Sequence, residues 1–265
     1  MRLAGKRFLV TGATGGIGAA VSLLLATQGA RLLLTATRQN HLDQLASILS
    51  ADTDVVTADL STSDGRERVL AACRSGGGID GVVNLAGVQD FGLFSEQSEA
   101  MIAKTLTTNL LAPVLLCREL LPLLLEKPEA MILNVGSIFG SIGHPGFVSY
   151  CTSKAGIKSF TEALARELAD TRVHVAYIAP RATATAMNGD RVNALNAALG
   201  NKADSPEFVA REIVRMMQGR RRLRYLGWPE KLFVGINAVL PDVVHRSLVR
   251  NLPLIKKYAT QGKSL

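Results

Sequence analysis

The sequence predicts an α/β fold: a doubly wound, mostly seven-stranded parallel sheet with helices on both faces, followed by a C-terminal helical extension. Strand-like apolar runs alternate with helix-like runs, which is the order of a sheet with crossover helices. The first six runs lack the polar alternation of a half-exposed strand, as expected where both sheet faces are buried. A glycine-rich loop joins the first run to the first helix, which is typical of such sheets.

The strand candidates are short runs rich in apolar or β-branched residues. They cover residues 8–11, 31–35, 54–57, 81–85, 131–136, 174–178 and 224–227. The carboxyl ends of parallel strands share one edge of the sheet, where ligands of doubly wound folds bind. Five residues lie at or near such ends and become candidate site positions: Gly12, Asp59, Asn84, Ser137 and Pro180.

Composition limits the class of protein. The 265 residues, 48% of them hydrophobic, suit one large domain with an ample core. No apolar run of transmembrane length and no secretory signal are expected. Three cysteines without disulfide or metal spacing and four scattered histidines predict no metal site and suit a reducing compartment. We therefore expect a cytoplasmic protein, with peripheral membrane association left open.

The first glycine-rich loop predicts a nucleotide site. Residues 11–18 read Thr-Gly-Ala-Thr-Gly-Gly-Ile-Gly between a strand and a helix. Glycines allow a tight turn and close approach of a pyrophosphate, and the following helix offers unpaired N–H groups. Out of context such a loop could be only a turn. The candidate cofactor contacts here are Gly12, Thr14, Gly15, Gly16, Ile17 and Gly18.

Tyr150 and Lys154 form the second motif. Residues four apart share one face of a helix, so the ammonium can approach the phenol. A nearby positive charge favours deprotonation, which a phenol with an ordinary pKa of ~10 needs near neutral pH. Alone, the pair could equally be a surface pair on a helix.

Together with further motifs in the same order, these residues resemble the short-chain dehydrogenase/reductase family, in its standard-length, single-domain branch with a Rossmann-type sheet. The resemblance covers about residues 6–227. Two positions depart from the family pattern, Leu85 and Arg181. The Arg181 side chain could contact a cofactor phosphate or an anionic substrate group, or it could point to solvent.

The resemblance implies roles for particular residues. Tyr150 would be the general acid/base, and Lys154 would lower the phenol pKa and hold the nicotinamide ribose. Ser137 would bind the substrate oxygen, and Asn109 would hold a water for proton relay. Further cofactor contacts are implied at Asp59, Leu60, Asn84, Ala86, Gly87, Tyr150, Lys154, Pro180, Thr183 and Thr185.

The end of the second strand favours NADP(H) over NAD(H). It reads Leu-Thr-Ala-Thr-Arg over residues 34–38, without the acidic residue that pairs with a free ribose 2′-OH. Arg38 can instead face a 2′-phosphate, and Thr37 adds a hydroxyl. Gly15 stands where some NADP-dependent relatives carry a second basic residue.

The net charge of +8 lies entirely in the last quarter of the chain. Residues 205–265 contain twelve Lys/Arg and four Asp/Glu, and residues 1–204 contain eighteen of each. The densest part comprises Arg220, Arg221, Arg222 and Arg224. Such a run could simply form a solvated face. If it binds a partner, the charge favours an acidic carrier protein, a coenzyme phosphate or an anionic membrane surface. Without a nucleic-acid motif, nucleic acid is not expected.

The predicted domain spans residues 1–228, with a substrate loop at about 183–201 that contains a helix-like stretch at 191–199. Residues 229–265 form a basic, amphipathic extension. Its apolar residues recur at near-helical spacing. That stripe could pack over the substrate loop, against another subunit or on a membrane. The resemblance implies a homodimer or homotetramer through helices at 101–125 and 149–168.

The leading hypothesis is an NADP(H)-dependent carbonyl reductase or alcohol dehydrogenase acting on a ketone or secondary alcohol. A 3-oxoacyl thioester or another lipid-like ketone is the favoured substrate, because of the basic, apolar extension. The alternatives are an NAD-dependent alcohol dehydrogenase of another small molecule and a non-catalytic nucleotide-sensing protein. The presence of Asn109, Ser137, Tyr150 and Lys154 favours an enzyme.

Overall fold

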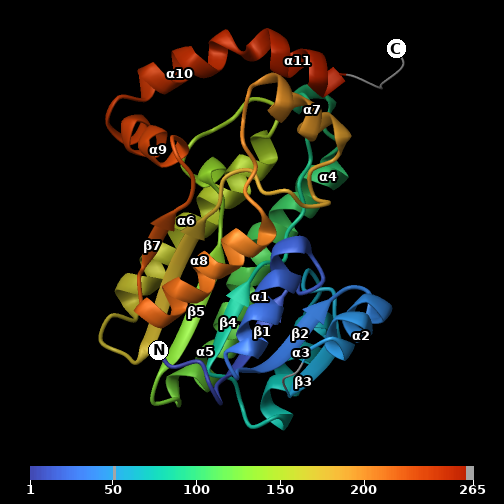
Figure 1. Cartoon of the computed structure of the whole chain (residues 1–265), viewed down its shortest axis with the longest axis vertical. Helices are drawn as coiled ribbons and strands as arrows, with labels where there is room; N and C mark the ends of the chain where they lie inside the picture. Colours follow the sequence, from blue (N-terminus) through green and yellow to red (C-terminus); the bar gives the residue numbers. More distant parts are fainter. Residues whose placement is uncertain (50–51, 261–265) are drawn as a thin grey trace.

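The computed structural model describes residues 1–49 and 52–260. Its centre is a seven-stranded sheet in which every neighbouring pair is parallel, in the order β3-β2-β1-β4-β5-β6-β7 (Figure 1). The predicted fold class is confirmed, and each predicted strand end lies within two residues of the observed one. The strands are β1 Arg7–Thr11, β2 Arg31–Ala36, β3 Thr53–Thr57, β4 Gly81–Asn84, β5 Ala130–Val135, β6 Val173–Ala179 and β7 Leu223–Tyr225.

Helices cover both faces of the sheet. On one face lie α1 (Gly16–Thr27), α2 (Gln39–Ser47) and α8 (Pro206–Gly219), and on the other lie α3 (Ser63–Ser75), α5 (Ala112–Leu125) and α6 (Val148–Glu167). The remaining helices are α4 (Glu99–Leu106), α7 (Asp190–Ala198), α9 (Glu230–Val239), α10 (Pro241–Arg250) and α11 (Leu252–Thr260).

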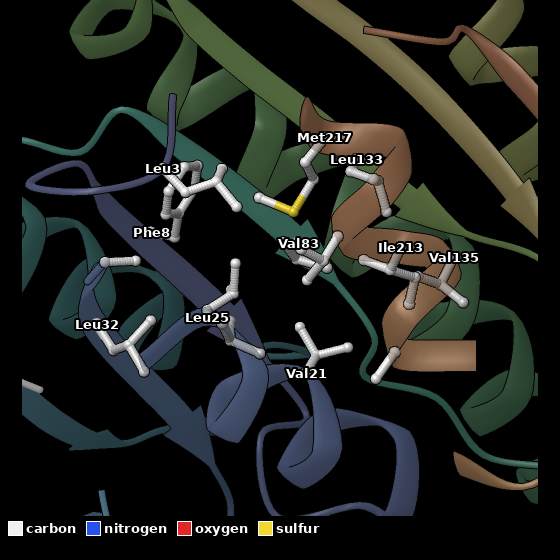
Figure 2. Packing of buried hydrophobic residues seen from close by; sticks show 14 of the residues in the cluster. Leu3, Phe8, Val21, Leu25, Leu32, Val83, Leu133, Val135, Ile213 and Met217 are labelled. Atoms are coloured by element: carbon white, nitrogen blue, oxygen red, sulfur yellow. The ribbon is translucent and has the colours of Figure 1, made fainter. Parts of the chain in front are cut away.

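Alternate residues of each central strand enter two separate cores. Figure 2 shows the first core, which contains Phe8 and Val83 of the sheet together with Leu25 of α1 and Met217 of α8. Leu9, the neighbour of Phe8, faces the second core. All of these side chains are fully buried, and each such burial stabilises the fold by roughly 1.5–3 kcal/mol. Burial on both faces explains the continuous apolar runs in the sequence.

One helical segment runs without interruption from Glu99 to Leu125 through α4, a π-helical turn (η2, Thr107–Leu111) and α5. Its 27 residues include a window of mean hydropathy 1.5, enough by length and composition to cross a membrane. This corrects the expectation that no apolar run has that length. In the fold, α5 is a core helix, because Leu116, Leu120 and Leu124 are fully buried in the second core.

The C-terminal helices form an arch beyond the end of the sheet from which β7 leaves (Figure 1). Helix α9 contacts the 3-10 turn η3 (Ile138–Gly140) that follows β5, and α11 packs against α7. Pro241 begins α10 and separates it from α9. Residues 261–265 of the predicted extension lie outside the described residues.

Candidate active site

The strand order reverses between β1 and β4, and the glycine loop lies at this switch point. The Thr11 hydroxyl accepts hydrogen bonds from the backbone N–H groups of Leu85 (3.0 Å) and Ala86 (3.2 Å). Gly12 has φ +62°, and a Cβ there would lie 2.8 Å from the Ala86 Cα. The loop and the segment after β4 are therefore in direct contact, which requires glycine at position 12.

The N-terminus of α1 suits a phosphate. No side chain caps it, and its first turn contains no acidic residue. A Cβ on Gly18 would lie 2.2 Å from the Gly12 carbonyl oxygen, and one on Gly16 would lie 2.8 Å from the Thr185 Cγ2. Thr185 of the predicted substrate loop thus lies against the glycine loop. The uncapped helix end and the close backbone packing fit the pyrophosphate of a dinucleotide.

Other predicted cofactor positions line the same edge of the sheet. Arg38 is exposed at the N-cap of α2. Asp59 follows β3, and its carboxylate accepts hydrogen bonds from the side chain and backbone of Ser61, which lower its pKa. Buried Thr183 donates a hydrogen bond to the Arg181 carbonyl oxygen (3.1 Å). Leu60 and Pro180 are buried.

The Asn84 side chain points into the protein interior. Its Nδ2 donates to the Asn134 Oδ1 (2.8 Å) and to the Cys117 Sγ (3.4 Å), which connects β4 to β5 and α5. The buried Oδ1 has no hydrogen-bond partner within the described ranges. Any cofactor contact at this position would therefore come from the backbone.

Tyr150 and Lys154 lie in the first two turns of α6, and both are buried. The Lys154 Nζ lies 5.7 Å from the centre of the Tyr150 ring and donates a hydrogen bond to the Val135 carbonyl oxygen (3.2 Å). Burial raises the pKa of Tyr150 to about 12, opposed by a hydrogen bond with Ser137, and lowers the pKa of Lys154 to about 8. In the protein without cofactor, burial therefore outweighs the predicted effect of the ammonium on the phenol.

Asn109 lies in the π-helical turn and is buried. Its Oδ1 accepts from the Val88 N–H (2.8 Å), and its Nδ2 donates to the Val88 carbonyl oxygen (2.8 Å) and the Ser153 Oγ (3.1 Å). A Cβ on Gly87 would lie 3.2 Å from this Oδ1 and 3.8 Å from the Lys154 Nζ. Both Nδ2 protons of Asn109 already have acceptors, so a water for proton relay would hydrogen-bond to the backbone of the π-helical turn.

Ser137 follows β5 and caps η3, its hydroxyl accepting from the Phe139 N–H (3.1 Å). Its backbone contacts Tyr177 of β6, a residue that sequence reasoning missed. A Cβ on Gly136 would lie 2.0 Å from the Tyr177 hydroxyl oxygen, and one on Gly140 would lie 2.7 Å from it. Gly136 and Gly140, on either side of Ser137, thus make room for the phenol. In the sequence, these two glycines were the available indication that another group packs closely against Ser137.

The side of the site next to Tyr150 is aromatic. Phe91 stacks on Phe147 with ring centres 4.8 Å apart, and Phe139 meets Tyr150 edge-on at 6.4 Å. Ile255 of α11, fully buried, belongs to the same apolar cluster. A cavity of about 450 Å³ adjoins Phe91, between the segment after β4 and the loop before α7; it is lined by residues 89–91, 186, 187 and 189–192.

Arg181 is shielded from solvent, and its guanidinium is occupied by acceptors of the protein itself. Its guanidinium forms ion pairs with Asp204 (2.7 Å) and Glu230 (3.3 Å) and donates to the Trp228 carbonyl oxygen (3.3 Å). Its side chain is only 15% exposed. Arg181 therefore joins the chain beyond the substrate loop to the first helix of the extension.

The densest basic run is separate from the site. Arg220, Arg221 and Arg222 immediately precede β7, so they lie at the amino edge of the sheet, opposite the glycine loop and Tyr150. Arg220 pairs with Glu129 (3.7 Å), and Arg224 pairs with Glu212. The excess charge is thus divided between this edge and the C-terminal arch.

Comparison with known proteins fits this geometry. The model of the short chain dehydrogenase family matches residues 6–196. The chain belongs to this family. Among its relatives, this short-chain dehydrogenase is 37% identical to Nodulation protein G of Rhizobium sp. (strain N33) over 72% of this chain and 78% of the relative. It is 35% identical to the 3-oxoacyl-[acyl-carrier-protein] reductase FabG of Vibrio cholerae over 68% and 74% of the two chains.

Solved structures show the same fold. A dehydrogenase/reductase from Sinorhizobium meliloti 1021 has a TM-score of 0.77 and 27% identity, covering 84% of this short-chain dehydrogenase and 93% of that chain. A short-chain dehydrogenase from Streptomyces avermitilis has a TM-score of 0.80 at 24% identity and covers 95% and 98%. The likeness to the second structure concerns the fold alone.

Proposed function

We propose that this oxidoreductase is an NADP(H)-dependent carbonyl reductase, or alcohol dehydrogenase in the reverse direction. The observation that carries the proposal is the grouping of buried Tyr150, Lys154 and Asn109 with Ser137 at the edge of the sheet where the glycine loop lies. A general acid, a cation beside it and a hydroxyl that binds an oxygen are what carbonyl reduction requires of a protein.

Each residue has a distinct task in this proposal. Tyr150, protonated at neutral pH because its pKa is about 12, donates the proton to the carbonyl oxygen. Ser137 donates a hydrogen bond to the same oxygen as negative charge develops on it. Lys154 stabilises the phenolate that remains, and Asn109 holds the π-helical turn beside Val88 and Ser153. The nicotinamide supplies the hydride.

Arg38 supports NADP(H) as the cofactor. It is exposed at the N-cap of α2, whose first turn contains no acidic residue. Within the residues described, Arg38 forms no ion pair, so its charge is free to meet a phosphate. A helix N-terminus and a guanidinium together favour a dianionic 2′-phosphate over a ribose hydroxyl.

For the substrate we infer a 3-oxoacyl thioester or another lipid-like ketone, which would place the enzyme in lipid metabolism. The aromatic wall of Phe91, Phe139 and Phe147 beside Tyr150 suits an apolar chain next to the reacting carbonyl. Relatives named 3-oxoacyl-[acyl-carrier-protein] reductase support the acyl class.

The test is NADPH consumption with a panel of carbonyl compounds that includes short and long 3-oxoacyl thioesters. Tyr150→Phe should abolish turnover of the true substrate while NADPH still binds. Tyr225→Phe, which removes a hydroxyl bonded to Ser141 outside the site, is the matched control and should retain turnover. Turnover of other ketones alone would overturn the acyl assignment, and turnover that persists in Tyr150→Phe would overturn the mechanism.

We also propose a cytoplasmic homodimer or homotetramer. The continuous helix from α4 to α5 exposes Leu111 (50%) and Leu125 (46%), which suits burial against another subunit. Light scattering of the purified protein tests this, and a monomer at micromolar concentration would contradict it.

A further inference from the structure

The outer surface of α9 and α10 is unusually apolar. Of the fifteen large apolar side chains exposed within the described residues, seven lie between positions 228 and 249. They are Trp228 (64%), Leu232 (45%), Phe233 (43%), Val239 (77%), Leu240 (58%), Val243 (55%) and Val249 (46%). We call these seven residues, with the basic residues among them, the extension surface. Monomeric proteins rarely expose so many such residues together unless the surface binds something.

The fold does not require these side chains. Within α9 only Val234 is buried, and within α10 only Val244 is buried. Leu232 and Val239 share the opposite side of α9 from Val234, and Leu240 and Val243 continue around the turn into α10. The arch is attached through its buried residues, so its exposed apolar residues remain free for a partner.

Helices α9 and α10 contain three Lys/Arg residues and two acidic residues. Lys231, Arg246 and Arg250 are exposed and take part in no ion pair within the part of the chain that the structure describes. The Lys231 Nζ lies 5.5 Å from the centre of the Trp228 ring. Of the two acidic residues in α9 and α10, Glu230 is turned inward to pair with Arg181, which Asp204 also contacts, and Asp242 is exposed.

We propose that the extension surface binds the face of a membrane that contains anionic lipids. Apolar side chains would enter the boundary between headgroups and acyl chains, Trp228 would lie at the headgroup level, and the cations would meet lipid phosphates. An isologous contact with a second copy would place the positive charges of both surfaces together. Docking of an acidic carrier would use the cations but leave the apolar residues unexplained.

This location would bring the bilayer to the entrance of the active site. The arch continues from α10 into α11, whose buried Ile255 shares an apolar cluster with Phe91 and Tyr150. A lipid-like ketone could then pass from the bilayer along the aromatic wall. The membrane contact itself does not depend on that substrate, because it rests on surface residues alone.

The experiment is co-sedimentation of the full chain with phosphatidylcholine vesicles, with and without phosphatidylglycerol, in the absence of cofactor and substrate. We expect binding only to the anionic vesicles, and its loss at high salt. The double variant Arg246→Glu/Arg250→Glu should weaken binding at least about 25-fold, given roughly 1 kcal/mol for each basic residue at the surface. Val239→Ser/Leu240→Ser should also weaken binding at low salt.

The matched control is Arg221→Glu/Arg222→Glu, which makes the same charge change on exposed residues at the opposite edge of the sheet. This variant should bind vesicles nearly as well as the parent protein. Equal sedimentation of all variants would overturn the proposal. So would a smaller oligomer in Val239→Ser/Leu240→Ser with unchanged vesicle binding, or binding of an acidic carrier protein without binding of vesicles. A failure of carbonyl reduction would leave the vesicle result unaffected.

Discussion

The hydroxyl oxygen of Tyr177 lies 3.3 Å from the backbone nitrogen of Ser137 and 3.3 Å from its carbonyl oxygen. It accepts a hydrogen bond from the first and donates one to the second. One phenol on β6 therefore bonds both backbone polar groups of the residue that we assign to binding the substrate oxygen; the carbonyl oxygen also accepts from the Gly140 N–H (2.9 Å), so it is the Ser137 N–H that depends on Tyr177. Glycine at positions 136 and 140 gives this phenol the space it occupies.

Tyr177→Phe should lower kcat about tenfold and leave NADPH affinity unchanged. The variant keeps the packed ring but leaves the half-buried Ser137 N–H without its partner, which costs on the order of 1–3 kcal/mol when the group is shielded from water. Steady-state kinetics and NADPH titration provide the measurement. Tyr225→Phe, on the neighbouring strand β7, serves as control. Equal losses of kcat and NADPH affinity would mean that Tyr177 only supports the fold.

The pH dependence of reduction should follow Lys154. The pKa of Lys154 is about 8 and that of Tyr150 is about 12, so raising the pH through 8 removes the ammonium while the phenol stays protonated. The phenolate formed on proton transfer then lacks its neighbouring cation, and kcat/KM should fall above pH 8. Lys154→Met should be far less active and should lack this fall. A parent profile that stays flat well above pH 8 would contradict the assignment.

Arg38→Asp should shift cofactor preference from NADPH to NADH. The carboxylate would repel a 2′-phosphate and accept a hydrogen bond from a free ribose hydroxyl. The ratio of the two kcat/KM values should change at least tenfold. Arg68→Asp, with the same charge change at an exposed position of α3, should leave it unaltered. Unchanged cofactor KM values in Arg38→Asp would disprove the role.

Arg181→Ala should destabilise the protein by roughly 1–3 kcal/mol, because it leaves the carboxylates of Asp204 and Glu230 without a cation in a partly buried site. Urea unfolding measures the change. Arg181→Lys should recover only part of the stability. The ammonium restores a positive charge, but it cannot bond both carboxylates as a guanidinium can. Stability equal to the parent in Arg181→Ala would show that the arch is held without this ion pair.

Much of the fold could be predicted from local pattern. The continuous apolar runs identified the central strands β1, β4, β5 and β6, because burial on both faces leaves no polar alternation, whereas the edge strand β7 is exposed or half-buried and was located from its position in the chain. The glycines between Thr11 and Gly18 and the spacing of Tyr150 from Lys154 marked the site, because a loop and two turns of helix are determined by nearby residues.

Other features depend on contacts between distant segments. Tyr177 meets Ser137 across 40 positions, and Arg181 meets Glu230 across 49. Gly136 and Gly140 indicate a close neighbour beside Ser137, but the residues next to Ser137 or Arg181 in the sequence do not identify the partner. The direction of the Tyr150 pKa shift also could not be read from its spacing to Lys154. Burial determines it, and burial is known only once the arch and the aromatic wall are in place.

Because of the π-helical turn at Thr107–Leu111, catalysis should depend on the number of residues in this helix. A π-turn holds one residue more than the α-turn it replaces, so removing one residue there would restore regular α-helical geometry and change the direction of the side chains within the turn. The hydrophobic contacts of α5 could survive such a deletion, whereas Asn109 would turn away from Val88 and Ser153. A single-codon deletion in this stretch should therefore give a protein that folds but does not turn over, separating the requirements of folding from those of catalysis.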